Sequence, residues 1–141
     1  MTPSADSALV SMVVCTRNRA ALLDDMLVTA TRLRLPAQLD WELLVVDNGS
    51  TDSTGEVIRR YQDRLPIRHV EEPRIGISHA RNRAVSEGRG RYLCWTDDDV
   101  RLDPDWLAAY LAAFERHPEA AVFGGRSTFD CCWTYITARR T

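Results

Sequence analysis

The sequence contains no lysine, because all 18 of its basic residues are arginine. Schiff-base chemistry and the phosphate-binding P-loop both require a lysine, so both are excluded. The sequence also lacks a run of about 18 apolar residues that would predict a membrane-spanning helix. Residues 1–7 have neither the basic start nor the apolar stretch of a signal peptide. We therefore expect a cytoplasmic protein in which any bound phosphate meets arginine, backbone or metal.

The protein has little net charge, since its 141 residues carry a formal charge of −2 at pH 7. A nucleic-acid-binding surface needs clustered basic residues, so we expect small-molecule partners and no nucleic acid. The four cysteines lack the paired spacing of a zinc site, and no nucleophile motif accompanies the three histidines. Cys15 and Cys94 lie in apolar runs and are expected to be buried in strands.

Strand and helix patterns alternate along the chain. Short apolar runs between polar residues predict strands covered on both faces, and apolar residues at helical spacing predict helices. The predicted strands are 8–16, 41–46, 67–70, 91–96 and 120–123, and the predicted helices are 22–33, 53–62, 76–87 and 103–116. This order predicts an α/β fold with a Rossmann-like, mostly parallel sheet flanked by helices.

The pattern predicts one folded unit over residues 8–126, preceded by a disordered tail at residues 1–7. Residues 127–141 contain two adjacent cysteines and show no periodicity. We expect them to form an irregular tail, as in a truncated chain. A sheet edge left open by a missing second half would favour self-association.

Residues 97–99 are three consecutive aspartates directly after the predicted strand 91–96. Adjacent like charges are costly unless water or a cation screens them, and carboxylates suit hard ions such as Mg²⁺ and Mn²⁺. Alternate residues of an extended segment face the same side, so Asp97 and Asp99 are expected to face one ligand. Taken alone, the triplet fits equally well a solvated acidic turn in which Asp99 or Asp103 caps the next helix. Leu102 excludes an EF-hand loop, because glycine is required at that position.

Two further polar clusters follow predicted strands. In the first, VDNGSTD, Asp47 is placed to accept hydrogen bonds from a ribose or base. Asn48, Ser50 and Asp52 are typical of local turns and helix caps, and we assign them that role. In the second, GISHARNRA, a glycine precedes a helix whose start can hold an anion, and Arg81 offers a forked contact to phosphate.

Together these clusters resemble family 2 glycosyltransferases of the GT-A fold over roughly residues 9–125. The segment VCTRNR is similar to that family's first nucleotide loop, VDNGSTD to its base-recognising acid loop and GISHARNRA to its arginine helix. The triplet DDD resembles its D-x-D metal motif. Each motif is weak alone, whereas four in this order are specific.

The resemblance implies a role for each matching residue. Thr16 and Asp47 would contact the base and ribose of a nucleotide, and Arg81 would lie near the diphosphate. Asp99, together with Asp97, would bind a divalent cation, Mn²⁺ or Mg²⁺, and Asp97 would also contact the nucleotide. The cation would bridge both phosphates and stabilise the leaving nucleoside diphosphate.

The function implied is an inverting, metal-dependent glycosyltransferase of hexosyltransferase type. It would transfer sugar from a nucleoside-diphosphate sugar, with a UDP-type donor favoured, to an unknown acceptor. Arg17 stands where many members have an aromatic residue, and its guanidinium plane can also stack on a base. Family members take their general base from the second half of the fold, and Asp130 has no surroundings that support this role.

The alternative to a transferase is a non-catalytic or truncated module that keeps only the donor-binding half. Such a module would bind a nucleotide and metal without transferring sugar. A sugar-phosphate nucleotidyltransferase is disfavoured, because its first loop is glycine-rich and the segment CTRNR contains no glycine.

Overall fold

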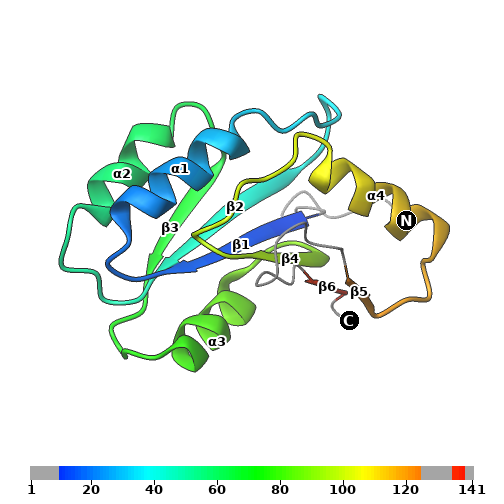
Figure 1. Ribbon diagram of the computed structural model, residues 1–141. Helices are drawn as coiled ribbons and strands as arrows, with labels where there is room; N and C mark the ends of the chain where they lie inside the picture. The colour runs from blue at the N-terminus through cyan, green and yellow to red at the C-terminus, as the bar shows by residue number, and fades with distance from the viewer. Residues whose placement is uncertain (1–9, 125–134, 139–141) are drawn as a thin grey trace.

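The computed structural model describes residues 10–124 and 135–138. Strands and helices alternate through most of this part of the chain, as the sequence predicts (Figure 1). In chain order the elements are β1 (Val10–Thr16), α1 (Ala20–Ala30), β2 (Trp41–Asp47), α2 (Thr54–Tyr61), β3 (Ile67–Glu71), α3 (Ile77–Glu87), β4 (Tyr92–Thr96), α4 (Trp106–Arg116), β5 (Val122–Gly124) and β6 (Tyr135–Ala138).

The strands form one sheet in the order β3-β2-β1-β4-β6-β5. The four strands β3, β2, β1 and β4 are parallel, whereas β6 runs antiparallel between β4 and β5. Thr16 pairs with Asp47, and Val14 pairs with Thr96, so β1, β2 and β4 end at the same edge of the sheet. The predicted α/β fold with a mostly parallel sheet is confirmed.

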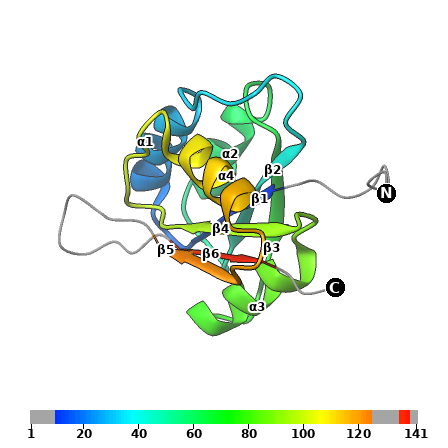
Figure 2. The ribbon, with the colours of Figure 1, turned by 90° about the vertical axis from the view of Figure 1, so that its right-hand side faces the viewer.

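Helices cover both faces of the sheet (Figures 1 and 2). Because side chains alternate along a strand, Met12 and Val14 of β1 lie in the core under α1 and α2, whereas Val13 packs with Ala80 and Ala84 of α3. A third apolar cluster lies under α4, where the rings of Tyr92 and Phe114 stack 3.8 Å apart. Within residues 10–124, no helix combines the length and apolar character needed to cross a membrane.

Strand β6 is the main departure from the predicted elements. Residues 127–141 were expected to be irregular, and within them the structure describes Tyr135–Ala138, which pair with β4 and β5. A four-residue strand carries too little local pattern to be recognised, since its hydrogen bonds come from distant partners. The predicted tail 1–7 and residues 127–134 lie outside the described residues.

Helix α4 begins at Trp106 rather than at residue 103. The preceding residues form a turn in which the Asp103 carboxylate accepts from the N–H of Asp105, and the Asp103 carbonyl oxygen accepts from the N–H of Trp106. No side-chain hydrogen bond caps the first turn of α4. The alternative in which Asp99 or Asp103 caps this helix is therefore not what the structure shows.

A buried polar network joins the amino ends of the parallel strands, at the edge opposite Thr16 and Asp47. The Ser11 hydroxyl donates to Glu42 Oε1 at 2.6 Å and accepts from the Gly90 N–H at 2.7 Å. Glu42 also accepts from the Arg89 N–H at 2.8 Å and from Arg68 Nε at 3.0 Å. This network connects β1, β2 and β3 to the turn that leads into β4.

Candidate donor-binding site

A cleft of about 470 Å³ opens at the carboxyl ends of β1, β2 and β4. In parallel α/β sheets ligands bind at this edge, where loops meet helix starts. The cleft brings together segments that are far apart in the sequence. Its lining consists of residues 15–17, Arg19, Asn48, residues 75–77, Ala80 and residues 97–99. All three clusters singled out from the sequence contribute to it.

The three aspartates of residues 97–99 divide into one buried and two exposed side chains. Asp98 is 5% exposed; its Oδ2 accepts from the Thr16 hydroxyl at 2.9 Å and its Oδ1 from Arg19 at 3.1 Å. Asp97 and Asp99 are exposed and line the cleft. The middle carboxylate therefore ties the first loop to the end of β4, which leaves the outer two carboxylates available to a ligand.

The charge around Asp97 suits a divalent cation. Partial desolvation within the cleft, followed by the negative charges of Asp99 and Asp98, raises the pKa of the Asp97 carboxyl, while Arg81 and Arg19 oppose this shift. A cation between Asp97 and Asp99 would relieve the repulsion. Residues 10–124 hold no ready group of three His, Cys, Asp or Glu metal ligands. Two carboxylates nevertheless fit Mg²⁺ or Mn²⁺, which complete their coordination with water and substrate phosphates.

Asp47, which the resemblance assigns to the base and ribose, is buried behind the cleft and is not part of its lining. Its Oδ1 accepts from the Ser50 N–H at 3.0 Å, and its Oδ2 lies 3.5 Å from His69 Nε2. Thr16 is also buried, and its hydroxyl donates to Asp98. The nucleotide contacts of Thr16 and Asp47 stay predictions.

Arg81 lies exposed on α3 and is not among the lining residues. Its positive charge nevertheless acts on ionisable groups that line the cleft. It lowers the pKa of Asp97 and of the Cys15 thiol. Burial has the larger effect on Cys15 and raises its pKa to about 11, so this thiol is neutral at pH 7. Cys94 is fully buried as expected, but Cys15 is half-buried, because the last residues of β1 reach the cleft.

The loops after β1 and β2 are tied to each other. Asn18, whose φ is +50°, donates its N–H to the Ser50 hydroxyl at 3.0 Å and accepts from the Thr51 N–H at 2.7 Å. Asp52 Oδ2 accepts from the N–H of Ala20, the first residue of α1, at 3.2 Å. Asp52 Oδ1 accepts from the N–H of Thr54, the first residue of α2, at 3.0 Å, so the cap role expected of Asp52 is present and extends to a neighbouring helix. These contacts hold the loops after β1 and β2 together beside the cleft.

Residues 11–141 match the glycosyl transferase family 2 domain. The chain belongs to glycosyl transferase family 2. Validoxylamine A glucosyltransferase of Streptomyces hygroscopicus subsp. jinggangensis is 38% identical over 129 residues, which cover 90% of this chain and 29% of that protein. A putative teichuronic acid biosynthesis glycosyltransferase of Bacillus subtilis is 29% identical over 84% of this chain and 47% of its own length. The chain thus spans less than half of these relatives.

Solved structures of similar fold agree with the family assignment. S. aureus TarS (residues 1–349), crystallised with UDP-GlcNAc, has a TM-score of 0.74 at 22% identity, covering 86% of this chain and 37% of TarS. A mannosyltransferase of Pyrobaculum calidifontis in complex with GDP-Man and Mn²⁺ has a TM-score of 0.73 at 29% identity, covering 84% of this chain and 35% of that one. The resemblance to GT-A glycosyltransferases is confirmed.

One residue of this family 2 domain has a different role from the one expected. The sequence pattern places Asn48 in a local turn, but its buried side chain bonds to the β3–α3 connection. Its Nδ2 donates to the carbonyl oxygens of Glu72 at 2.9 Å and Arg74 at 2.8 Å, and its Oδ1 accepts from the Gly76 N–H at 2.9 Å. These partners are 24 to 28 residues away, so no local pattern predicts them.

Proposed function

We propose that this chain binds a nucleoside-diphosphate sugar together with a divalent cation in the 470 Å³ cleft, as the donor-binding part of an inverting hexosyltransferase. The observation that carries the proposal is the pair of exposed carboxylates, Asp97 and Asp99, at the carboxyl end of β4. The buried Asp98 between them fixes the backbone that presents them. Membership of glycosyl transferase family 2 supports this chemistry.

Each proposed role follows from position in the cleft and from the family resemblance. Asp99 and Asp97 would hold Mn²⁺ or Mg²⁺, and a bound cation would neutralise charge on the departing diphosphate. Arg81 would add positive charge on the same side, since its field already reaches Asp97. Thr16, Arg17 and Asp47 would contact the nucleoside. We favour a UDP-type donor over donors with other bases.

The first prediction concerns metal-dependent nucleotide binding. We expect calorimetry with UDP, GDP and ADP to give tighter binding in Mn²⁺ than in EDTA for at least one nucleotide. Asp99→Asn and Asp97→Asn should each weaken the Mn²⁺-dependent affinity by about tenfold or more, because each removes one negative ligand. The matched control is Asp63→Asn, an exposed residue beyond α2 that does not line the cleft.

Equal nucleotide affinities with and without Mn²⁺, in the unaltered protein and in all three variants, would contradict the proposed metal site. Binding by itself does not distinguish an enzyme from a donor-binding module. Release of sugar from UDP-glucose or GDP-mannose would support transferase chemistry. Tight, metal-dependent binding without sugar release or transfer would instead identify a donor-binding module.

A further inference from the structure

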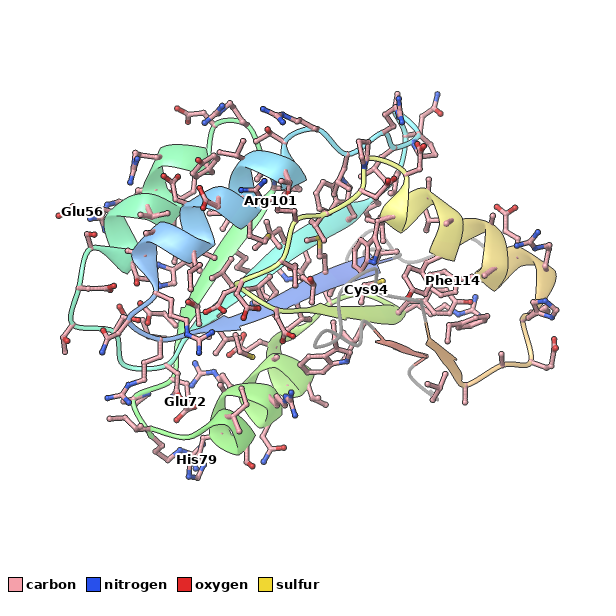
Figure 3. The ribbon with its side chains drawn as sticks, viewed as in Figure 1. Glu56, Glu72, His79, Cys94, Arg101 and Phe114 are labelled. Carbon is pink, nitrogen blue, oxygen red and sulfur yellow. The ribbon has the colours of Figure 1, made fainter. Side chains whose placement is uncertain are left out.

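The connection between β3 and α3 presents two isoleucines to the cleft. Ile75 and Ile77 are 59% and 56% exposed, which is unusual for large apolar side chains, and both line the cleft together with Gly76. Gly76 between them has a φ of +141°, a conformation that residues with side chains rarely adopt. Glu72 begins this connection, and His79 lies beyond it in the first turn of α3 (Figure 3). The backbone is thus specialised to keep this apolar pair at the surface.

Asn48 fixes this backbone from the neighbouring strand end. Its side chain is 5% exposed and makes three hydrogen bonds, using both N–H groups and the carbonyl oxygen. Leaving a buried polar group without its partner costs about 1–3 kcal/mol, so these bonds strongly favour one loop conformation. Asn48 itself follows Asp47 directly and lines the cleft. It therefore links the end of β2 to the apolar pair.

Glu72 reinforces the same conformation from within the loop. Its side chain is 1% exposed, and its Oε1 accepts from the N–H of Arg74 at 3.0 Å and from Arg74 Nε at 2.9 Å. The Glu72 N–H donates to the carbonyl oxygen of Asp47 at 2.9 Å. The loop is thus ordered by the protein's own contacts. Ile75 and Ile77 stay exposed because the backbone is held, although burial would favour them by the hydrophobic effect.

A nucleoside-diphosphate sugar has at one end a base whose flat faces can pack against apolar side chains, and next to its sugar a diphosphate with two negative charges. The cleft has the same division, with apolar side chains at residues 75 and 77 and carboxylates at residues 97 and 99. We propose that Asn48 is a positioning residue that holds Ile75 and Ile77 as an apolar wall for the nucleoside of the donor. This inference rests on the proposed function and assigns the nucleoside to one side of the cleft.

The first test measures nucleotide affinity in Asn48 variants. Asn48→Ala removes all three hydrogen bonds, whereas Asn48→Asp keeps the acceptor for Gly76 and places a carboxylate against two carbonyl oxygens. Both should weaken binding of the preferred nucleotide in Mn²⁺ by about tenfold, while the ratio of affinities in Mn²⁺ and EDTA stays unchanged. Ser11→Ala, which removes buried hydrogen bonds at the opposite sheet edge, should leave affinity unchanged. Equal affinity losses in Asn48→Ala and Ser11→Ala would overturn the proposal.

A double-mutant cycle then separates positioning from general damage. Ile75→Ala and Ile77→Ala should each weaken binding by a few-fold, as expected for lost apolar contact. If Asn48 acts through these side chains, each isoleucine substitution should reduce nucleotide affinity clearly less in the Asn48→Ala background than in the unaltered protein. Fully additive losses would overturn the positioning role.

Hydrogen exchange of the nucleotide-free protein tests the loop independently of any ligand. The Gly76 N–H, which donates to Asn48 Oδ1, should exchange about tenfold faster or more in Asn48→Ala, while exchange in β2 stays unchanged. Unchanged exchange at Gly76 contradicts the positioning role even if nucleotide binds. Altered exchange without nucleotide binding by the unaltered protein would instead contradict the proposed function and the nucleoside assignment.

Discussion

Gly90→Ala should lower the free energy of unfolding by about 3 kcal/mol or more. A Cβ at this position would lie 2.2 Å from the backbone N of Ser11, 2.6 Å from the carbonyl carbon of Val10 and 2.8 Å from the carbonyl oxygen of Tyr92. All three are backbone atoms, so no side-chain rotation relieves the overlap. β1 and the turn before β4 would have to separate, which breaks the hydrogen bond from Gly90 to Ser11.

The matched control is Gly124→Ala in β5, where an added Cβ meets no atom within 4 Å. We expect it to change stability by less than about 0.5 kcal/mol. Urea unfolding followed by circular dichroism measures both variants. A Gly90→Ala protein as stable as Gly124→Ala would show that the two backbones do not approach as closely as described. Because β4 also leads to residues 97–99, Gly90→Ala should weaken metal-dependent nucleotide binding as well.

The parallel part of the fold could be predicted because its signals are local. Each of the strands β1, β2 and β4 is a run of apolar residues between polar loops, and helical spacing marks the segments between them. By contrast, β6 consists of the four residues 135–138, whose pairing with β4 and β5 depends on sheet hydrogen bonds to residues far away in the chain. The expectation of an irregular segment was wrong there, because tertiary pairing outweighs a weak local pattern.

The location of the site could be predicted for a topological reason. Polar clusters that follow parallel strands meet at one sheet edge, so residues 15–17, Arg19, Asn48 and residues 97–99 share a cleft although they are far apart in sequence. Individual side-chain roles depend on partners that sequence spacing does not reveal. Asp98 bonds to Thr16 across 82 residues, and Asn48 bonds to Gly76 across 28. A turn residue and a residue that fixes a distant loop look the same in the sequence.

Glu42→Gln is expected to lower the free energy of unfolding by about 2–3 kcal/mol at pH 7. Glu42 is 7% exposed and pairs with Arg68, which also contacts Glu87 at the end of α3. The amide preserves the shape of the side chain but removes its negative charge, so the positive charge of Arg68 loses Glu42 and keeps Glu87 as an ion-pair partner. The control is Glu56→Gln on the exposed surface of α2 (Figure 3), expected within about 0.5 kcal/mol of the unaltered protein.

The pH dependence of this loss distinguishes a charge effect from a packing effect. Burial tends to raise the pKa of Glu42, but hydrogen bonds from Arg68, Ser11 and the Arg89 N–H outweigh it and hold the pKa below 4.5. A carboxyl group whose pKa is lowered in the folded state stabilises the protein at pH values above its unfolded-state pKa. This stabilisation is lost as pH falls through the folded-state pKa. The stability difference between the unaltered protein and Glu42→Gln should therefore stay constant from pH 7 to about pH 5 and narrow below pH 4.5. A difference that persists unchanged to about pH 3.5 would indicate packing instead. Since the other carboxylates are common to both proteins, the difference chiefly reports the charge on Glu42.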